Sequence, residues 1–237
     1  MIACGGSVPE PETTPETTPE PTAEATRPPP QEVSASVDLD GAHIDIRIFA
    51  PAAGGAQARA AAEIAVGEVR RVGTLAGSSP ELTAARGSEA PGEVSLQLLQ
   101  LGYAIDRAAD ALTNAGMTDF MVARGDTVRA RGSQDGSFER GWRVALPGAT
   151  ADSPPEGTVA LLGRSAHTSR RADGVTTAVA PSTVTAIIWA ERGVDGGPGV
   201  LQEADGQRIP LRIGTSAGDR RHNDAFDSLL DPVRVMR

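Results

Sequence analysis

The sequence predicts an α+β domain, with mixed or antiparallel strands packed against helices, after an extended amino-terminal segment. Residues 8–32 are rich in Pro, Thr and Glu, residues 43–49 alternate apolar and polar side chains, and residues 95–115 repeat apolar side chains at three- and four-residue spacings. Alternation favours a half-buried strand, and the longer spacings favour an amphipathic helix. Helices and antiparallel hairpins in one chain are typical of α+β proteins. We therefore expect residues 33–237 to form one domain.

The amino-terminal segment predicts a disordered tether. Residues 8–32 hold eight of the 18 prolines, six Glu and one Arg, and so carry −5 of the formal net charge of −9. Such a segment cannot bury enough apolar surface to offset the entropy lost on ordering, and repeated prolines keep it extended. The alternative is a disordered tail with no function.

The first residues predict a lipid anchor. Residues 1–6 read Met-Ile-Ala-Cys-Gly-Gly, which resembles the end of a bacterial lipoprotein signal, where the cysteine becomes the acylated first residue. On this interpretation residues 1–7 are the remnant of an anchor, and Cys4 holds the protein on a membrane of the cell envelope, outside the cytoplasm. The alternative is that Cys4 is an ordinary exposed thiol.

The first strand and the first helix come early in the domain. Residues 43–49 form the strand, which ends at Pro51 and the Gly54-Gly55 pair, and residues 56–72 form the helix. The strand buries Ile44, Ile46 and Ile48, and the helix buries Ala58, Ala61, Ala65, Val69 and Val72. Residues 73–93 are rich in Gly, Ser, Pro and Glu and predict a loop.

A second helix is expected to begin at Ser95, which is a plausible N-cap, and to end at Gly116. Its core-facing side chains recur at spacings of three and four: Leu98, Leu101, Ile105, Ala108 and Leu112.

Strands and one further helix complete the predicted domain. We expect strands at 118–124, 127–131, 141–146, 158–162, 175–180 and 207–213, with Asp135-Gly136 as a hairpin turn. Residues 164–173 predict an Arg-rich loop, which is either a solvated run of charge or a site for a diphosphate. A helix at 183–192 is expected to end at Gly193.

Composition excludes several classes of function. A net charge of −9 argues against binding nucleic acid, which needs a basic surface. The absence of lysine excludes a Schiff-base lysine and the lysine of a phosphate-binding P-loop. A single cysteine excludes an internal disulfide. The three histidines, His43, His167 and His222, lack the spacing of metal ligands and predict surface or loop positions.

Residues 101–147 carry a resemblance to a known family. They read LGYAIDRAADALTNAGMTDFMVARGDTVRARGSQDGSFERGWRVALP. This stretch resembles the FAD:protein FMN transferases, the ApbE-like flavinyltransferases, in a shortened and divergent form. The resemblance implies a T-fold-related α+β domain outside the cytoplasm. It also implies FAD and Mg²⁺ as cofactors, an acceptor protein as partner, and transfer of FMN to a Thr or Ser hydroxyl with release of AMP.

The resemblance implies cofactor-binding roles for five residues: Gly102, Tyr103, Asp106, Gly125 and Thr168. Two registers stay open in the Arg-Gly-Asp-Thr turn at 124–127, because either Gly125 matches the first family glycine or Asp126 matches the family aspartate.

Other positions of the family motifs are replaced. Ser95 stands at the family's aspartate, Gln97 and Leu98 at its pair of small residues, and Leu101 at its charged residue. Ile187 stands at the family's metal-binding acid if residues 186–191 match that motif. Added side chains block close approach of backbone to a diphosphate, and isoleucine cannot ligate Mg²⁺. We therefore assign no catalytic or metal-binding residue.

Two functions follow as alternatives. The first is FAD binding with Mg²⁺-dependent FMN transfer. The second is a catalytically degenerate envelope lipoprotein that acts as a binding or interaction module.

Overall fold

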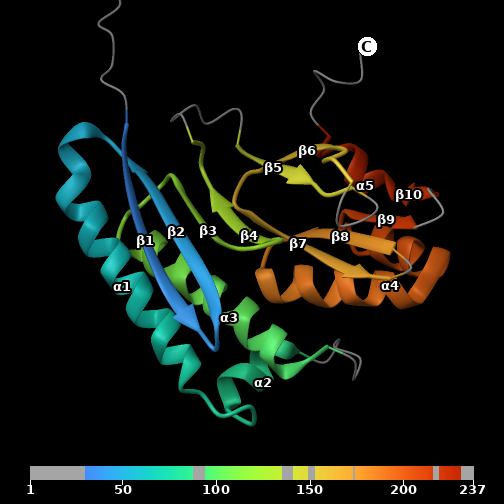
Figure 1. Cartoon of the computed structure of the whole chain (residues 1–237), viewed down its shortest axis with the longest axis horizontal. Coiled ribbons are helices and arrows are strands. Elements are labelled where there is room, and N and C mark those ends of the chain that lie inside the picture. The colour runs from blue at the N-terminus through green and yellow to red at the C-terminus, as the bar shows by residue number, and fades with distance from the viewer. Residues whose placement is uncertain are drawn as a thin grey trace, which may run out of the picture.

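The computed structural model describes residues 30–87, 94–134, 141–148, 153–172, 174–215 and 219–230. Within them the chain forms an eight-stranded antiparallel sheet in the order β1-β2-β3-β4-β7-β8-β9-β10, and a separate two-stranded sheet, β5-β6 (Figure 1). Helices and antiparallel strands lie in one fold, so the α+β prediction is confirmed. The proposed anchor and nearly all of the proposed tether lie outside the described residues.

The amino-terminal hairpin contains the predicted strand and a partner that the sequence did not predict. β1 (Gln31–Leu39) pairs with β2 (Ala42–Ala50) through the two-residue turn Asp40-Gly41. Both turn residues have positive φ, 48° and 75°, as a tight hairpin of this kind requires. β1 begins two residues before the domain boundary that we placed at residue 33. The three predicted core isoleucines, Ile44, Ile46 and Ile48, are fully buried.

The first helix is confirmed and lies against the hairpin. A short 3₁₀ turn, η1 (Ala52–Gly54), leads into α1 (Gly55–Gly73). The predicted stripe is buried at every position: Ala58, Ala61, Ala65, Val69 and Val72. Small side chains allow the helix to approach the strands and α3 closely.

The second long helix, α3 (Leu96–Asn114), has the two ends that the sequence predicts. Ser95 Oγ accepts a hydrogen bond from the Leu98 N–H at 3.2 Å. At the other end Gly116 has φ +82°, and the N–H groups of Gly116 and Met117 bond the carbonyls of Thr113 and Leu112. This is the Schellman arrangement, which glycine favours because it lacks a Cβ.

The predicted loop at 73–93 contains a helix. α2 (Pro80–Arg86) begins at Ser79, whose hydroxyl accepts a hydrogen bond from Leu82 N–H at 3.3 Å. Proline suits the first turn of a helix, since the N–H that it lacks has no helical partner there. Leu82 is buried and anchors this short helix.

The strands after α3 are confirmed, but one pairing differs from the expectation. β3 (Phe120–Arg124) and β4 (Thr127–Arg131) form a hairpin. β5 (Trp142–Leu146) pairs with β6 (Gly157–Leu161) in the small sheet, not with β4. The predicted hairpin turn at Asp135-Gly136 falls outside the described residues.

The predicted Arg-rich loop is a central strand. β7 (Arg164–Arg171) lies between β4 and β8 (Gly174–Ala180), and residues 165–169 are all buried. The sequence did not predict this strand, because its residues are small and polar. A strand that is covered on both faces also lacks the usual alternation of apolar and polar side chains. The prediction of a loop here was wrong.

The carboxy-terminal helix continues past its predicted end. α4 (Thr183–Gly206) runs through Gly193. A Cβ at Gly193 would lie 2.4 Å from Cγ2 of Thr176 on β8, so this glycine permits close packing of helix on sheet. The predicted strand at 207–213 is β9 (Leu211–Thr215), followed by β10 (Arg220–His222) and α5 (Asp224–Asp227).

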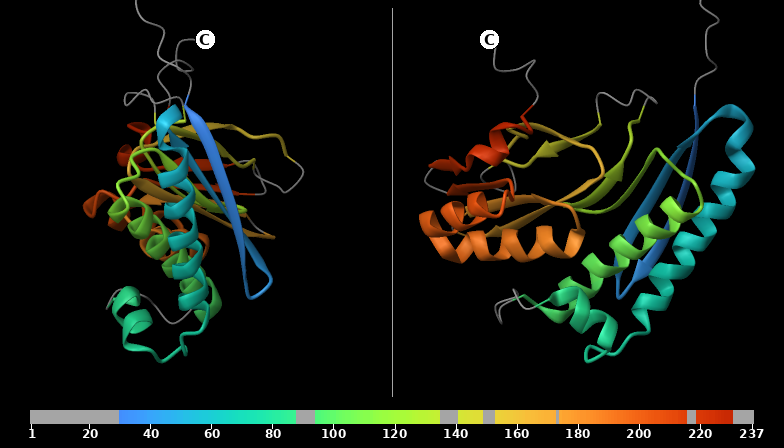
Figure 2. Two further views of the ribbon diagram at one scale, coloured as in Figure 1. Left: turned by 90° about the vertical axis from the view of Figure 1, so that its left-hand side faces the viewer. Right: turned by 180° about the vertical axis from the view of Figure 1, so that it is seen from behind.

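The sheet lies between a layer of long helices and the small sheet. α1 packs on β1 and β2, α4 packs on β7 and β8, and α3 lies between α1 and α4 (Figure 2). On the other face Val128, Ala166 and Val179 pack with residues of the small sheet, including Trp142 and Val159. One face therefore carries the long helices and the other carries β5, β6 and Phe226 of α5.

Candidate functional site

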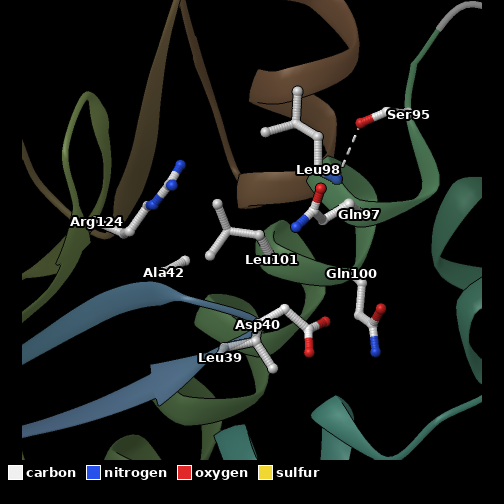
Figure 3. A pocket seen from close by; sticks show the side chains of 9 residues that line it. All are labelled: Leu39, Asp40, Ala42, Ser95, Gln97, Leu98, Gln100, Leu101 and Arg124. Atoms are coloured by element: carbon white, nitrogen blue, oxygen red, sulfur yellow. Dashed lines mark hydrogen bonds between the residues drawn. The ribbon is translucent and has the colours of Figure 1, made fainter.

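A cavity of about 240 Å³ lies where the start of α3 meets two hairpin turns (Figure 3). The β1–β2 turn, the first turns of α3 and the end of β3 supply its walls. Its lining residues are Leu39, Asp40, Ala42, Ser95, Gln97, Leu98, Gln100, Leu101 and Arg124. We call this the α3 pocket.

The α3 pocket gathers the positions at which the family motif is replaced. Ser95, Gln97, Leu98 and Leu101 all line it. The replaced motif positions therefore mark the wall of a real cavity.

Two of the polar lining groups are used inside the fold. Ser95 Oγ caps α3, and Gln100 Nε2 donates to the carbonyl oxygens of Val72 at 2.9 Å and Leu75 at 3.4 Å. The bonds of Gln100 fasten the start of α3 to the end of α1, so the pocket wall is held in place.

The α3 pocket is small for FAD. Pockets that enclose a drug-sized ligand measure about 300–1,000 Å³, and this one holds about 240 Å³. Leucine side chains at 98 and 101 stand where the family motif has a small and a charged residue. The residues present fit at most a part of FAD.

Mg²⁺ does not fit the residues present. Ile187, which stands at the metal-binding acid if residues 186–191 match that motif, is fully buried, and a Cβ at Gly102 would lie 2.6 Å from its Cδ1. Within the described residues no group of three or more His, Cys, Asp and Glu side chains lies close enough together to hold a metal ion. Hard oxygen ligands are what Mg²⁺ requires.

Gly102 and Tyr103 serve the packing of helices. Gly102 faces Val184 and Ile187 where α3 crosses α4. The Tyr103 hydroxyl donates to Glu81 Oε2 at 3.1 Å, and Glu81 also accepts from Arg71 at 2.9 Å. Burial, which is the larger cause, and the hydrogen bond to Glu81 both raise the pKa of Tyr103. Neither residue lines the α3 pocket.

Asp106 joins α3 to the start of α4. Its carboxylate accepts hydrogen bonds from Thr183 N–H at 2.8 and 2.9 Å, from Val184 N–H at 3.2 Å and from Arg129 at 3.2 Å. Burial raises the pKa of Asp106, while Arg129 and the backbone donors act in the opposite direction. The carboxylate occupies the positive end of the α4 dipole, where an external anion would otherwise bind.

Gly125 and Thr168 lie at a second cavity of about 240 Å³, between the large and the small sheet. Gly125 has φ +52° in the β3–β4 turn, and Thr168 Oγ1 lies 2.9 Å from Thr177 Oγ1. Asp126 Oδ2 accepts from Arg170 Nε at 2.7 Å at this cavity. The five predicted cofactor residues are thus divided between a helix crossing and this cavity, and none lines the α3 pocket.

The sequence did not predict a largely buried cluster of polar side chains. Thr127 Oγ1 lies 2.8 Å from His167 Nδ1, and His167 Nε2 lies 3.8 Å from Glu191 Oε1. His167, followed by Ser169 and Arg171, lowers the pKa of Glu191 to about 2. We expected His167 on the surface, but it is 6% exposed. Thr127, His167 and Glu191 come from β4, β7 and α4 and share no sequence spacing. Only the pairing of β4 with β7 and the packing of α4 on β7 bring them together.

The predicted lipidation site lies outside the described residues. Among the helices of the described chain, none is both long and apolar enough to cross a membrane.

Comparisons with known proteins agree with the fold and with the central motifs. The ApbE family model matches residues 78–180. The crystal structure of the Pseudomonas stutzeri flavinyl transferase ApbE superposes with a TM-score of 0.58 at 14% identity, covering 85% of this chain and 97% of that one. A comparison with curated proteins found no match.

Two other solved structures show the same similarity. The flavin transferase ApbE from Vibrio cholerae has a TM-score of 0.59 at 17% identity and covers 85% of this chain and 100% of that one. The ApbE protein from Thermotoga maritima has a TM-score of 0.57 at 12% identity, with coverage of 85% and 100%. This chain therefore matches the ApbE family model over residues 78–180 and shares the fold of ApbE flavin transferases.

Proposed function

We propose that this chain is a flavin-transferase-like protein that no longer transfers FMN and acts as a binding module in the cell envelope. One observation carries the proposal: Ile187, which takes the place of the family's metal-binding acid if residues 186–191 match that motif, is a fully buried core residue packed on Gly102. A metal that neutralises the diphosphate of FAD would need oxygen ligands, and the α3–α4 crossing supplies hydrocarbon instead.

The α3 pocket supports the same proposal. Leu98 and Leu101 place side chains where the family motif has a small and a charged residue. Backbone N–H groups at this turn of α3 are consequently screened from a diphosphate. The pocket remains open to smaller molecules, which is consistent with binding without transfer.

Retained FMN transfer is the competing function. The match over residues 78–180 and the shared fold favour it, since they place the chain beside proteins named as flavin transferases. In that case the chain would use FAD and Mg²⁺ and modify an acceptor protein. The competing function needs metal ligands other than those of the family motif.

AMP release separates the two functions. The full chain is incubated with FAD, Mg²⁺ and a threonine-containing acceptor protein, with the Vibrio cholerae flavin transferase as positive control. We expect AMP from the control and none from this chain above the rate with no enzyme. Mg²⁺-dependent AMP release together with a flavin-labelled acceptor would establish transfer and refute the proposal.

We also propose that Cys4 anchors the protein to a bacterial membrane through a lipid and that residues 8–32 form the tether. The sequence around Cys4 and the proline content of that segment support this. Mass spectrometry of the protein expressed from its complete gene tests it, with Cys4→Ser as control. Acyl chains on Cys4 are expected, and an unmodified cysteine in membrane-free fractions would contradict the anchor.

A further inference from the structure

The α3 pocket carries two opposite charges around an apolar floor. Asp40, in the β1–β2 turn, and Arg124, at the end of β3, lie on different sides of Leu101 (Figure 3). Both side chains are exposed, and within the described part of the chain neither has an ion pair or a hydrogen bond. The two charges are thus available to a ligand.

The pocket floor is apolar and firmly held. Leu39 and Leu101 are 6% and 4% exposed, and Leu98 is half-buried beside them. The Ser95 cap orders the first turn of α3 and the Gln100 bonds fix α3 against α1, so little ordering is needed before a ligand binds. Gln97 adds an amide that can both donate and accept hydrogen bonds.

We propose that the α3 pocket binds a small zwitterion with an apolar side chain, that is, a molecule with the chemistry of a free amino acid such as leucine. This inference rests on the proposed binding function and names its ligand class. The carboxylate meets Arg124, whose forked donors match its two oxygens. The ammonium group meets Asp40, and the side chain covers Leu39, Leu98 and Leu101. A volume of about 240 Å³ suits one amino acid rather than a nucleotide.

Edited ligands and matched variants test each contact separately. Calorimetric titration of the full chain uses L-leucine, leucine methyl ester, which lacks the carboxylate charge, and N-acetyl-leucine, which lacks the ammonium charge. The variants are Arg124→Gln and Asp40→Asn. Asn at position 40 keeps the turn, because it adopts positive φ readily. Arg164→Gln is the control, since Arg164 is exposed and lies outside the pocket lining.

When a ligand lacks one of its two charges, the variant that removes the partner of that charge should no longer change the affinity. Leucine should bind with a Kd of about 1 mM or tighter, and either variant should weaken it about fivefold, the range of a partly exposed ion pair. Arg124→Gln should leave the affinity for the methyl ester unchanged, and Asp40→Asn should leave that for N-acetyl-leucine unchanged. The Arg164→Gln control should bind leucine as the parent chain does.

Three results would overturn the inference. The first is no binding of leucine at concentrations tenfold above the expected Kd. The second is binding that neither variant weakens. The third is equal affinity for leucine and N-acetyl-leucine, which would assign the pocket to the carboxyl end of a peptide. The unmodified chain with the three ligands decides the matter even if a variant does not fold. AMP release, which tests the proposed function, is measured in a separate assay. A failure of the proposed function can therefore be told apart from a failure of leucine binding.

Discussion

The carboxylate of Asp106 bonds the backbone N–H of Thr183 through both of its oxygens, at 2.8 and 2.9 Å. A side chain in the middle of α3 therefore caps the first turn of α4, 77 residues later in the sequence. Arg129 on β4 holds the same carboxylate and also donates to the carbonyl of Pro181, just before the helix. The ApbE-like Gly-Tyr-Ala-Ile-Asp motif is, in this chain, a structural joint between two helices and a strand.

Replacement of Asp106 by Asn should destabilise the fold. The variant replaces one acceptor oxygen by an amide NH2 group that faces the N–H groups of Thr183 and Val184, and it leaves Arg129 without its carboxylate, at a cost of about 1–3 kcal/mol. Urea unfolding measures this change. Asp110→Asn is the control, because its carboxylate is 49% exposed and contacts Arg107 at 3.5 Å. The control should change stability by less than about 0.5 kcal/mol; equal effects in the two variants would contradict the joint.

Alanine at Gly102 and at Gly67 should have different effects. Both glycines lie inside long helices, where Ala is favoured by about 1 kcal/mol. A Cβ at Gly67 meets nothing within 4 Å, whereas a Cβ at Gly102 meets Ile187 at 2.6 Å. Gly67→Ala should therefore raise the free energy of unfolding by about 0.5–1 kcal/mol. Gly102→Ala should be less stable than Gly67→Ala by at least about 1 kcal/mol; identical thermal unfolding curves would exclude a tight α3–α4 crossing.

The half-buried Glu191 should contribute stability that is lost in acid. Its pKa in the folded protein is about 2, below the ordinary value of 4.5. A carboxyl whose pKa is lowered by folding stabilises the fold above its ordinary pKa, and this contribution falls as pH drops from 4.5 towards 2.

Glu191→Gln should reveal that contribution. We expect a loss of about 2 kcal/mol at neutral pH, after allowance for screening by solvent. The loss shrinks as pH falls from 4.5 towards 2, because the unfolded parent then binds a proton at Glu191 that folding must release. Denaturant unfolding at a series of pH values measures the difference. Glu203→Gln, which removes the 47% exposed partner of Arg192, is the control and should cost less than about 1 kcal/mol at neutral pH, because exposed ion pairs contribute little. A constant difference across the acid range would assign the effect to packing rather than to charge.

Gly125 should accept Asn better than Ala. Its φ of +52° lies in the left-handed region, and a Cβ at this position would meet no atom within 4 Å, so conformation alone sets the cost. Left-handed backbone costs an ordinary L-residue about 1–2 kcal/mol, and the cost is smaller for Asn than for most residues. Gly125→Ala should thus lower the unfolding free energy by about 1 kcal/mol, with Gly125→Asn between it and the parent. Thermal unfolding ranks the three proteins, and an Ala variant as stable as the parent would contradict the assigned turn.

Local sequence pattern predicted the elements that have clear periodicity. The stripe from Ala58 to Val72 specifies α1, and Ser95 and Gly116 specify both ends of α3, because caps and helical spacing act within a few residues. The replaced positions Ser95, Gln97, Leu98 and Leu101 lie on neighbouring turns of one helix, and the structure shows that they line the α3 pocket. The cofactor-binding roles of Gly102, Tyr103 and Asp106 stay predictions, and only the fold shows that their neighbours come from α2, α4 and β4.

The sequence by itself determined the α+β class, the main helices and most strands. Only the tertiary structure decided that residues 164–171 form a strand, that α4 continues past Gly193, and that Thr127, His167 and Glu191 meet. The physical reason is the range of the interactions. Helix caps and periodic burial depend on residues that are close in sequence. The central strand of small polar residues is instead stabilised by β4, β8 and α4, which lie up to tens of residues away in the chain.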